Sequence, residues 1–186
     1  MNPLKTLLRV IAGAILVAPL VAVPSASAAA STAAAPYVRI TVNSITSWRT
    51  QHSGTDMTFL KISGPSLMPL MEVTYEVWPG NGASYPMTPG KCLVFLPAEC
   101  PGGIPYVYPV YEHDIVTKPV FTPNGGRVTL NLRKRNPWIA DDDLLLESFP
   151  LGPLTNSVTY SFRPHAYTQG ADYQIDVTLS PSMTPY

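Results

Sequence analysis

Three consecutive aspartates, Asp141, Asp142 and Asp143, form the densest group of potential ligands in the sequence. They lie in the segment NPWIADDDLLL, directly after Pro137 and Trp138 at an expected strand end. Neighbouring carboxylates repel one another, so they are either solvated on an exposed turn or neutralised by a hard cation. Calcium suits the second arrangement because it takes roughly six to eight oxygen ligands from flexible loops. Both interpretations stand, and the second makes all three residues candidate calcium ligands.

A basic run, residues 133–135 (RKR), precedes this acidic triplet. Three consecutive strand residues spread over both faces of a sheet, and such a run is most often a solvated strand end. The alternative is that the run lies opposite Asp141, Asp142 and Asp143 and neutralises them. The acidic cluster would then need no metal.

The group best suited to acid–base catalysis is Glu112-His113-Asp114. Carboxylates beside a histidine stabilise its charged form, which could serve as an acid or base. Neighbours on a strand point to opposite faces, however, so His113 and Asp114 do not readily face each other. The sequence contains neither G-x-S-x-G nor H-E-x-x-H. We therefore predict no catalytic residue, and keep a small secreted hydrolase with a site near His113 as the alternative.

The two cysteines, Cys92 and Cys100, are predicted to form a disulfide that closes the segment CLVFLPAEC. Secreted chains with an even number of cysteines usually pair them. A zinc site would need more Cys or His at ligand spacing, and a redox pair would read C-x-x-C.

Aromatic residues gather around this segment and make a candidate binding patch. Tyrosine and tryptophan are enriched at recognition surfaces because one end is apolar and the other can be hydrated. They are also ordinary strand residues, and alternate tyrosines on a strand are often half buried. The predicted patch comprises Trp78, Tyr85, Tyr106, Tyr108 and Tyr111.

The elements that must position these residues are strands, because apolar residues recur with a period of two. Such alternation is typical of strands half buried in an antiparallel sheet. Clusters of Gly, Pro and Asn separate the runs, and 21 prolines leave little room for long helices. We predict an all-β antiparallel sandwich of about seven or eight strands, in one domain from residue 37 to 186. The strand-like runs are 38–42, 58–62, 71–77, 128–132, 158–162 and 173–179.

Several of these segments together resemble the C2-like calcium-binding β-sandwiches, including small secreted proteins of high-GC bacteria. The resemblance is carried by GTDMTFLKI (54–62), by the strand 128–132 and by NPWIADDDLL. It implies that Asp56 is the aspartate of an early calcium loop, that Lys61 ends that segment, and that Asp142 is the last aspartate of a later loop. The predicted calcium ligands are therefore Asp56, Asp141, Asp142 and Asp143.

The sequence departs from that family pattern at three positions. Lys134 and Asn136 stand where the family has paired acids, and Leu145 stands where it has a glycine. Losing two carboxylates, one of them to a cation, would remove much of the charge that holds calcium. The resemblance therefore implies a degenerate site.

The first 28 residues are predicted to be a secretory signal peptide. Lys5 and Arg9 give a positive start, Val10–Leu20 an apolar run, and Ser25–Ala28 a small-residue cleavage site. Residues 29–36 read as a flexible lead. Of the 12 Lys and Arg, removing Lys5 and Arg9 leaves ten against 12 Asp and Glu. This balance argues against nucleic acid, whose phosphates demand a basic face.

Taken together, the residues predict an extracellular, non-catalytic binding module. No transmembrane anchor is expected after the signal peptide is removed. The expected partner is an extracellular protein or surface ligand that the sequence does not identify. Besides the hydrolase, a secreted inhibitor or structural envelope protein is the remaining alternative.

Overall fold

The computed structural model describes residues 34–51, 54–66, 68, 71–80, 82–95, 100–104, 106–107, 118–163 and 170–185. The predicted signal peptide and the start of the predicted lead lie outside these ranges, as do Tyr108 and residues 111–114 with His113. No helix in the described part of the chain is long and apolar enough to cross a membrane.

Strands make up most of the described chain, and a short 3-10 turn, η1 (Pro101–Gly103), follows Cys100. The strands are β1 (Tyr37–Arg49), β2 (Asp56–Pro65), β3 (Glu72–Trp78), β4 (Tyr85–Met87), β5 (Lys91–Val94), β6 (Tyr106–Val107), β7 (Val120–Phe121), β8 (Arg127–Lys134), β9 (Asp142–Pro150), β10 (Val158–Phe162) and β11 (Asp172–Ser182).

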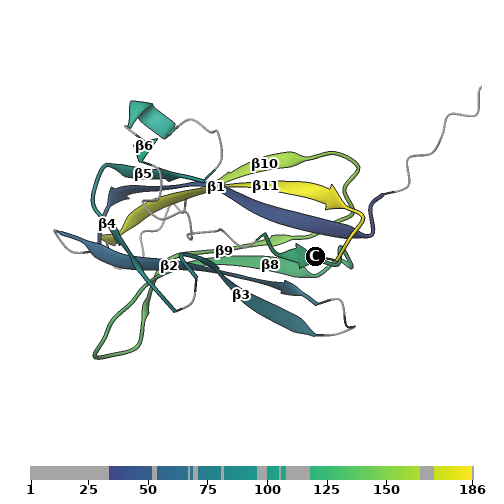
Figure 1. Ribbon diagram of the computed structural model, residues 1–186, viewed down its shortest axis with the longest axis horizontal. Helices are drawn as coiled ribbons and strands as arrows, with labels where there is room; N and C mark the ends of the chain where they lie inside the picture. Colours follow the sequence, from purple (N-terminus) through teal and green to yellow (C-terminus); the bar gives the residue numbers. More distant parts are fainter. Residues whose placement is uncertain are drawn as a thin grey trace, which may run out of the picture. The chain divides into compact units, whose positions relative to one another are not determined.

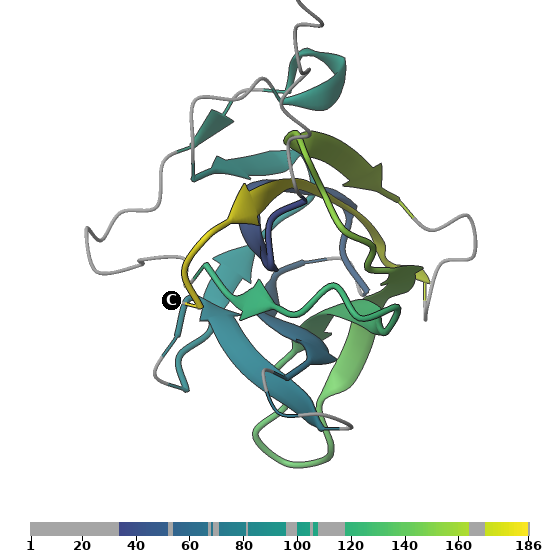
Figure 2. The same ribbon diagram turned by 90° about the vertical axis from the view of Figure 1, so that its right-hand side faces the viewer.

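Two sheets stack as a sandwich, which Figure 1 shows from the side and Figure 2 after a quarter turn. One sheet has the order β10-β11-β1-β5-β6, with β7 also paired to β1. The other has the order β3-β2-β8-β9, with β4 also paired to β2. Apart from the parallel pair β5 and β6, the strand pairs described are antiparallel. The predicted antiparallel sandwich is confirmed.

Alternation along the strands builds the core between the two sheets. In β8, Val128, Leu130 and Leu132 are fully buried, whereas the residues between them are partly exposed. Ile175 and Val177 of β11 alternate in the same way in the other sheet. Because successive strand side chains point to opposite faces, the period seen in the sequence directly specifies the inward face.

An irregularity in the β8–β9 hairpin decides which charged residues meet. Leu132 pairs with Leu145, but the next residue, Arg133, pairs with Asp143, so Leu144 is the extra residue of a bulge. Leu144 and Leu145 are both buried. The bulge lets both leucines enter the core while the aspartates before them stay beside β8.

The predicted disulfide between Cys92 and Cys100 is present and joins β5 to the start of η1. Cys92 itself is fully buried and pairs with Thr46 of the central strand β1. The bridge therefore ties the chain around η1 to β5, the strand next to β1 in the same sheet.

Candidate functional site

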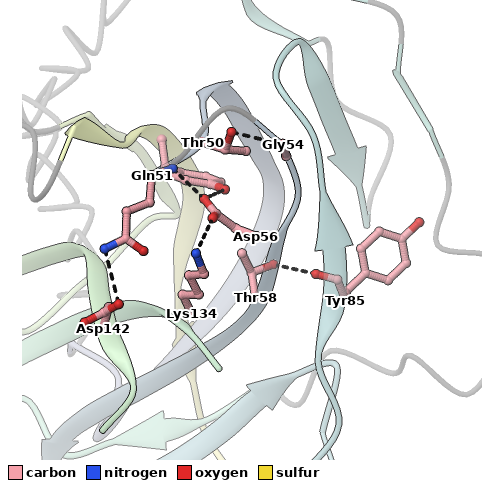
Figure 3. A network of polar contacts seen from close by, with 9 residues as sticks. Thr50, Gln51, Gly54, Asp56, Thr58, Tyr85, Lys134 and Asp142 are labelled. Atoms are coloured by element: carbon pink, nitrogen blue, oxygen red, sulfur yellow. Dashed lines mark hydrogen bonds and ion pairs between the residues drawn. The ribbon is translucent and has the colours of Figure 1, made fainter. Parts of the chain in front are cut away.

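A network of polar side chains occupies one end of the sandwich, where β1 and β8 end and β2 and β9 begin (Figure 3). Antiparallel pairing of β2 with β8 places Thr58 opposite Lys134. The start of β2, with Asp56, thus lies beside the end of β8. These segments are far apart in sequence, so pairing between strands builds the network.

Asp56 is the centre of the network and is almost completely buried. The ammonium of Lys134 lies 3.2 Å from its Oδ1. The backbone N–H of Gln51 donates to its Oδ2 at 2.9 Å, and the hydroxyl of Tyr173 donates to the same oxygen at 2.8 Å. Buried charges persist in proteins when they are paired and hydrogen-bonded, and both carboxylate oxygens meet that condition here.

Tyr173 reaches this site from β11 in the other sheet. Burial of the phenol, and next the negative charge of Asp56, raise the pKa of Tyr173 well above its ordinary value. The hydroxyl therefore keeps its proton and remains a donor to Asp56. This contact connects the two sheets at a buried polar point.

The three aspartates of the acidic triplet have different surroundings. Asp142 accepts a hydrogen bond from Nε2 of Gln51 at 3.2 Å, so it joins the Asp56 network through that side chain. Asp143 pairs with Arg133 at 2.8 Å. Asp141 accepts from the backbone N–H of Asn136 at 3.1 Å, within the loop between β8 and β9.

The structure thus brings Asp56 and Asp142 to the same end of the sandwich, as the predicted calcium set requires. It places Gln51 between them and Lys134 against Asp56 (Figure 3). Among the residues described, no three His, Cys, Asp or Glu side chains gather closely enough to hold a metal ion. The acidic triplet does not lie entirely in a loop. Asp142 and Asp143 are the first residues of β9, and only Asp141 precedes the strand.

The structure agrees with the alternative interpretation of the basic run at Arg133, which binds Asp143 of the acidic triplet. Lys134 also pairs with an aspartate, but that residue is Asp56 rather than a member of the triplet. The guanidinium of Arg135 lies 4.6 Å from the ring centre of Phe59. All three basic side chains therefore contact the body of the protein.

The β8–β9 loop displays a feature that the sequence interpretation missed. Trp138 is 90% exposed and the adjacent Ile139 is 67% exposed. The loop beneath them is braced: Arg133 donates to the backbone oxygen of Asp141 at 2.8 Å, and Trp138 N–H donates to Oδ1 of Asn136 at 3.2 Å. The sequence did contain a signal for this exposed apolar pair, because a tryptophan and an isoleucine stand together in a turn between charged segments.

Two members of the predicted aromatic patch, Trp78 and Tyr85, are buried and cannot contribute to a surface. Their rings pack together at 5.4 Å, and Trp78 also contacts Phe95. A register shift between β2 and β3 pairs Leu60 with Trp78, which puts the indole into the core. Tyr106 begins β6, but its side chain lies outside the description.

Comparisons with known proteins find similarity in fold. No family model matches the chain, and no curated protein matches it. A C2 domain of plant extended synaptotagmin 1 is similar with a TM-score of 0.46 and 9% identity, over 81% of this chain and 98% of that domain.

Human GIVD cytosolic phospholipase A2 is similar in two structures. The complex with methyl gamma-linolenyl fluorophosphonate has a TM-score of 0.43 and 9% identity, and 77% of this chain corresponds to 16% of that chain. A second complex, with this inhibitor and terbium chloride, has a TM-score of 0.41 and 6% identity, and 77% of this chain corresponds to 17% of that one.

Proposed function

We propose that this chain is an exported, non-catalytic binding module that contacts an extracellular partner through the tip of its β8–β9 loop. The observation that carries the proposal is the exposure of Trp138 and Ile139 on a loop held by internal hydrogen bonds. The disulfide between Cys92 and Cys100 is compatible with export, since such bonds persist in oxidising compartments.

An exposed tryptophan at a braced tip is well suited to binding. A tryptophan side chain buries about 150–250 Å² in a contact, which at about 25 cal/mol per Å² corresponds to roughly 4–6 kcal/mol before the costs of association. A loop that is already ordered loses less conformational freedom when it binds. Trp138 therefore has the properties of an energetic anchor in an interface.

We further propose that the Asp56 network functions without calcium. The donor set is a poor fit for that ion, because the Lys134 ammonium already neutralises Asp56 and the amide of Gln51 stands between Asp56 and Asp142. Calcium would have to displace a cation that is covalently part of the chain. The network is better suited to holding the base of the β8–β9 loop.

The binding proposal is tested by replacing both tip residues, Trp138→Ser with Ile139→Ser, and by using Met183→Ser as a control. Met183 is also a large exposed apolar residue, but it lies outside the loop. Material from native culture supernatant and cell surface should give a partner retained by the wild type and the control, and lost by the tip variant. A partner retained equally by the tip variant would contradict the proposal, as would recovery of none by the wild type.

The calcium proposal is tested by thermal melting in calcium and in EDTA. The expected result is one melting temperature in both conditions, and a shift at millimolar calcium would overturn it. Replacing Lys134 and Asn136 by Asp should restore the two acids of the family pattern. The double variant is expected to gain calcium-dependent stability, and no gain would count against the aligned loop geometry.

A further inference from the structure

Strand β10 is an edge strand with an open side. It pairs with β11 in an unbroken register that runs from Val158 opposite Leu179 to Phe162 opposite Ile175. No strand in the described part of the chain pairs with its other edge. Figure 1 shows β10 beside β11 at the margin of the upper sheet. Backbone donors and acceptors along that edge are therefore available to a further strand.

The sequence of β10, VTYSF, lacks the devices that usually protect a sheet edge. Natural edge strands carry lysines, prolines, bulges or inward-pointing charges that prevent pairing with other chains. Residues 158–162 contain no charge, proline or glycine, and their register with β11 has no bulge. The next residue, Arg163, has its guanidinium bound to Asp172 at 2.6 Å.

The inward face of β10 is apolar but only partly covered. Val158 and Tyr160 are 37% and 42% exposed, although their partners Leu179 and Val177 are buried. The ring of Tyr160 is one of three nearly parallel aromatic rings, which also include Phe162 and Phe149 of β9 at separations of 5.0–6.1 Å. This aromatic layer reaches the margin of the sandwich and stops there with apolar surface still in water.

We propose that β10 pairs antiparallel with β10 of a second copy of this chain, about a two-fold axis at Tyr160. In that register Val158 of one copy faces Phe162 of the other, and Thr159 faces Ser161. Apolar side chains then meet apolar side chains on the inner face, and hydroxyls meet hydroxyls on the outer face. The two aromatic layers become continuous across the axis, and the sheet extends from one copy into the other.

A second copy fits this edge because the strand complements itself in both pattern and charge. A two-fold interface requires one surface to match its own image, and the order apolar, hydroxyl, apolar, hydroxyl, apolar is symmetric about its centre. The strand is neutral, so two copies approach without repulsion. In the same register Arg163 faces Ser157 of the other copy, which is uncharged.

The test is the molar mass of the purified protein by sedimentation velocity from micromolar to millimolar concentration. The wild type is expected to approach twice the mass of one chain. Tyr160→Lys, which places a charge at the axis, is expected to stay at the mass of one chain. Met183→Lys adds the same charge at an exposed apolar residue elsewhere and should dimerise like the wild type.

Hydrogen exchange of the wild type gives a second readout that does not depend on the variant folding. Those amides of residues 158–162 that point away from β11 should become more protected as the concentration rises. No comparable change is expected in β3 at the far edge of the other sheet. A wild type that stays monomeric throughout would overturn the proposal, and would leave an extended segment of another protein as the candidate occupant. A dimer that persists in a folded Tyr160→Lys variant, or that leaves residues 158–162 unprotected, would also overturn it.

Discussion

Replacing Lys134 by methionine is the most direct test of the buried network. The side chain of Asp56 is 1% exposed and that of Lys134 is 18% exposed, with 3.2 Å between their charged atoms. Lys134→Met keeps an apolar stem but leaves Asp56 as a buried anion. Removing one partner of a buried ion pair costs about 3–5 kcal/mol because the remaining charge is uncompensated. Since water reaches part of Lys134, we expect a loss of about 3 kcal/mol in the free energy of unfolding.

The measurement is urea denaturation, supported by a melting temperature that should fall by roughly 6–12 °C for a domain of this size. A matched control is Asp143→Asn, which breaks the neighbouring pair with Arg133. Those two side chains are 38% and 26% exposed. Exposed pairs contribute about 0–1 kcal/mol, so this variant should be nearly as stable as the wild type.

A double variant shows whether the stranded charge causes the loss. Asp56→Asn combined with Lys134→Met contains neither charge, so it should be more stable than the sum of the two single losses implies. If Lys134→Met costs no more than Asp143→Asn, burial does not make the pair of Lys134 with Asp56 stronger than the exposed pair. If the losses of Asp56→Asn and Lys134→Met simply add, the two residues are not coupled.

Three further predictions use other parts of the fold. Folding raises the pKa of Tyr173, so as pH rises the unfolded chain loses this proton before the native protein does. The free energy of unfolding should therefore be unaffected by the titration of this group below about pH 10, the ordinary pKa of tyrosine, and should fall above it. Urea denaturation from neutral to alkaline pH should show the fall, and Tyr173→Phe should reduce it. Replacing the Cys92–Cys100 disulfide by two serines should cost about 2.5 kcal/mol, from the chain entropy of its short loop, in equilibrium unfolding. Gly64→Ala should lower the free energy of unfolding by about 1–3 kcal/mol, because the new Cβ would lie 2.7 Å from a buried phenylalanine ring. The control Gly152→Ala should be close to neutral, because no atom lies within 4 Å of its Cβ position. The tyrosine prediction is contradicted if Tyr173→Phe loses as much stability at alkaline pH as the wild type. The disulfide prediction is contradicted if the protein with two serines is as stable as the wild type. The glycine prediction is contradicted if the two alanine variants are equally stable.

Much of the sandwich could be predicted from the sequence because strand alternation is a local property. The runs at 38–42, 128–132 and 173–179 each lie in a strand, with their apolar residues inward. Short strands such as β6 and β7, with two residues each, are too brief to show a period. The segment that begins at Asp142 was not among the predicted strand runs. A bulge interrupts its alternation, and only pairing with β8 identifies it as a strand.

The predicted binding residues had mixed outcomes for a related reason. Trp78 follows an alternating run, but a register shift against β2 turns it into the core. Trp138 received no role in the sequence interpretation, yet it is among the most exposed large apolar residues described. Whether an aromatic residue is buried depends on what packs over it, and a single strand does not contain that information.

Local pattern was therefore sufficient for the class of fold and the disulfide, since alternation and cysteine pairing act within short stretches of chain. The acidic and basic runs were also visible in the sequence, but whether they are solvated or neutralised stayed open there. Only the tertiary structure decided which charges meet. Asp56 and Tyr173 are 117 residues apart, and they are in contact because the two sheets stack. Lys134 reaches Asp56 because β2 pairs with β8, so a position that the sequence related to a metal ligand instead supplies the cation.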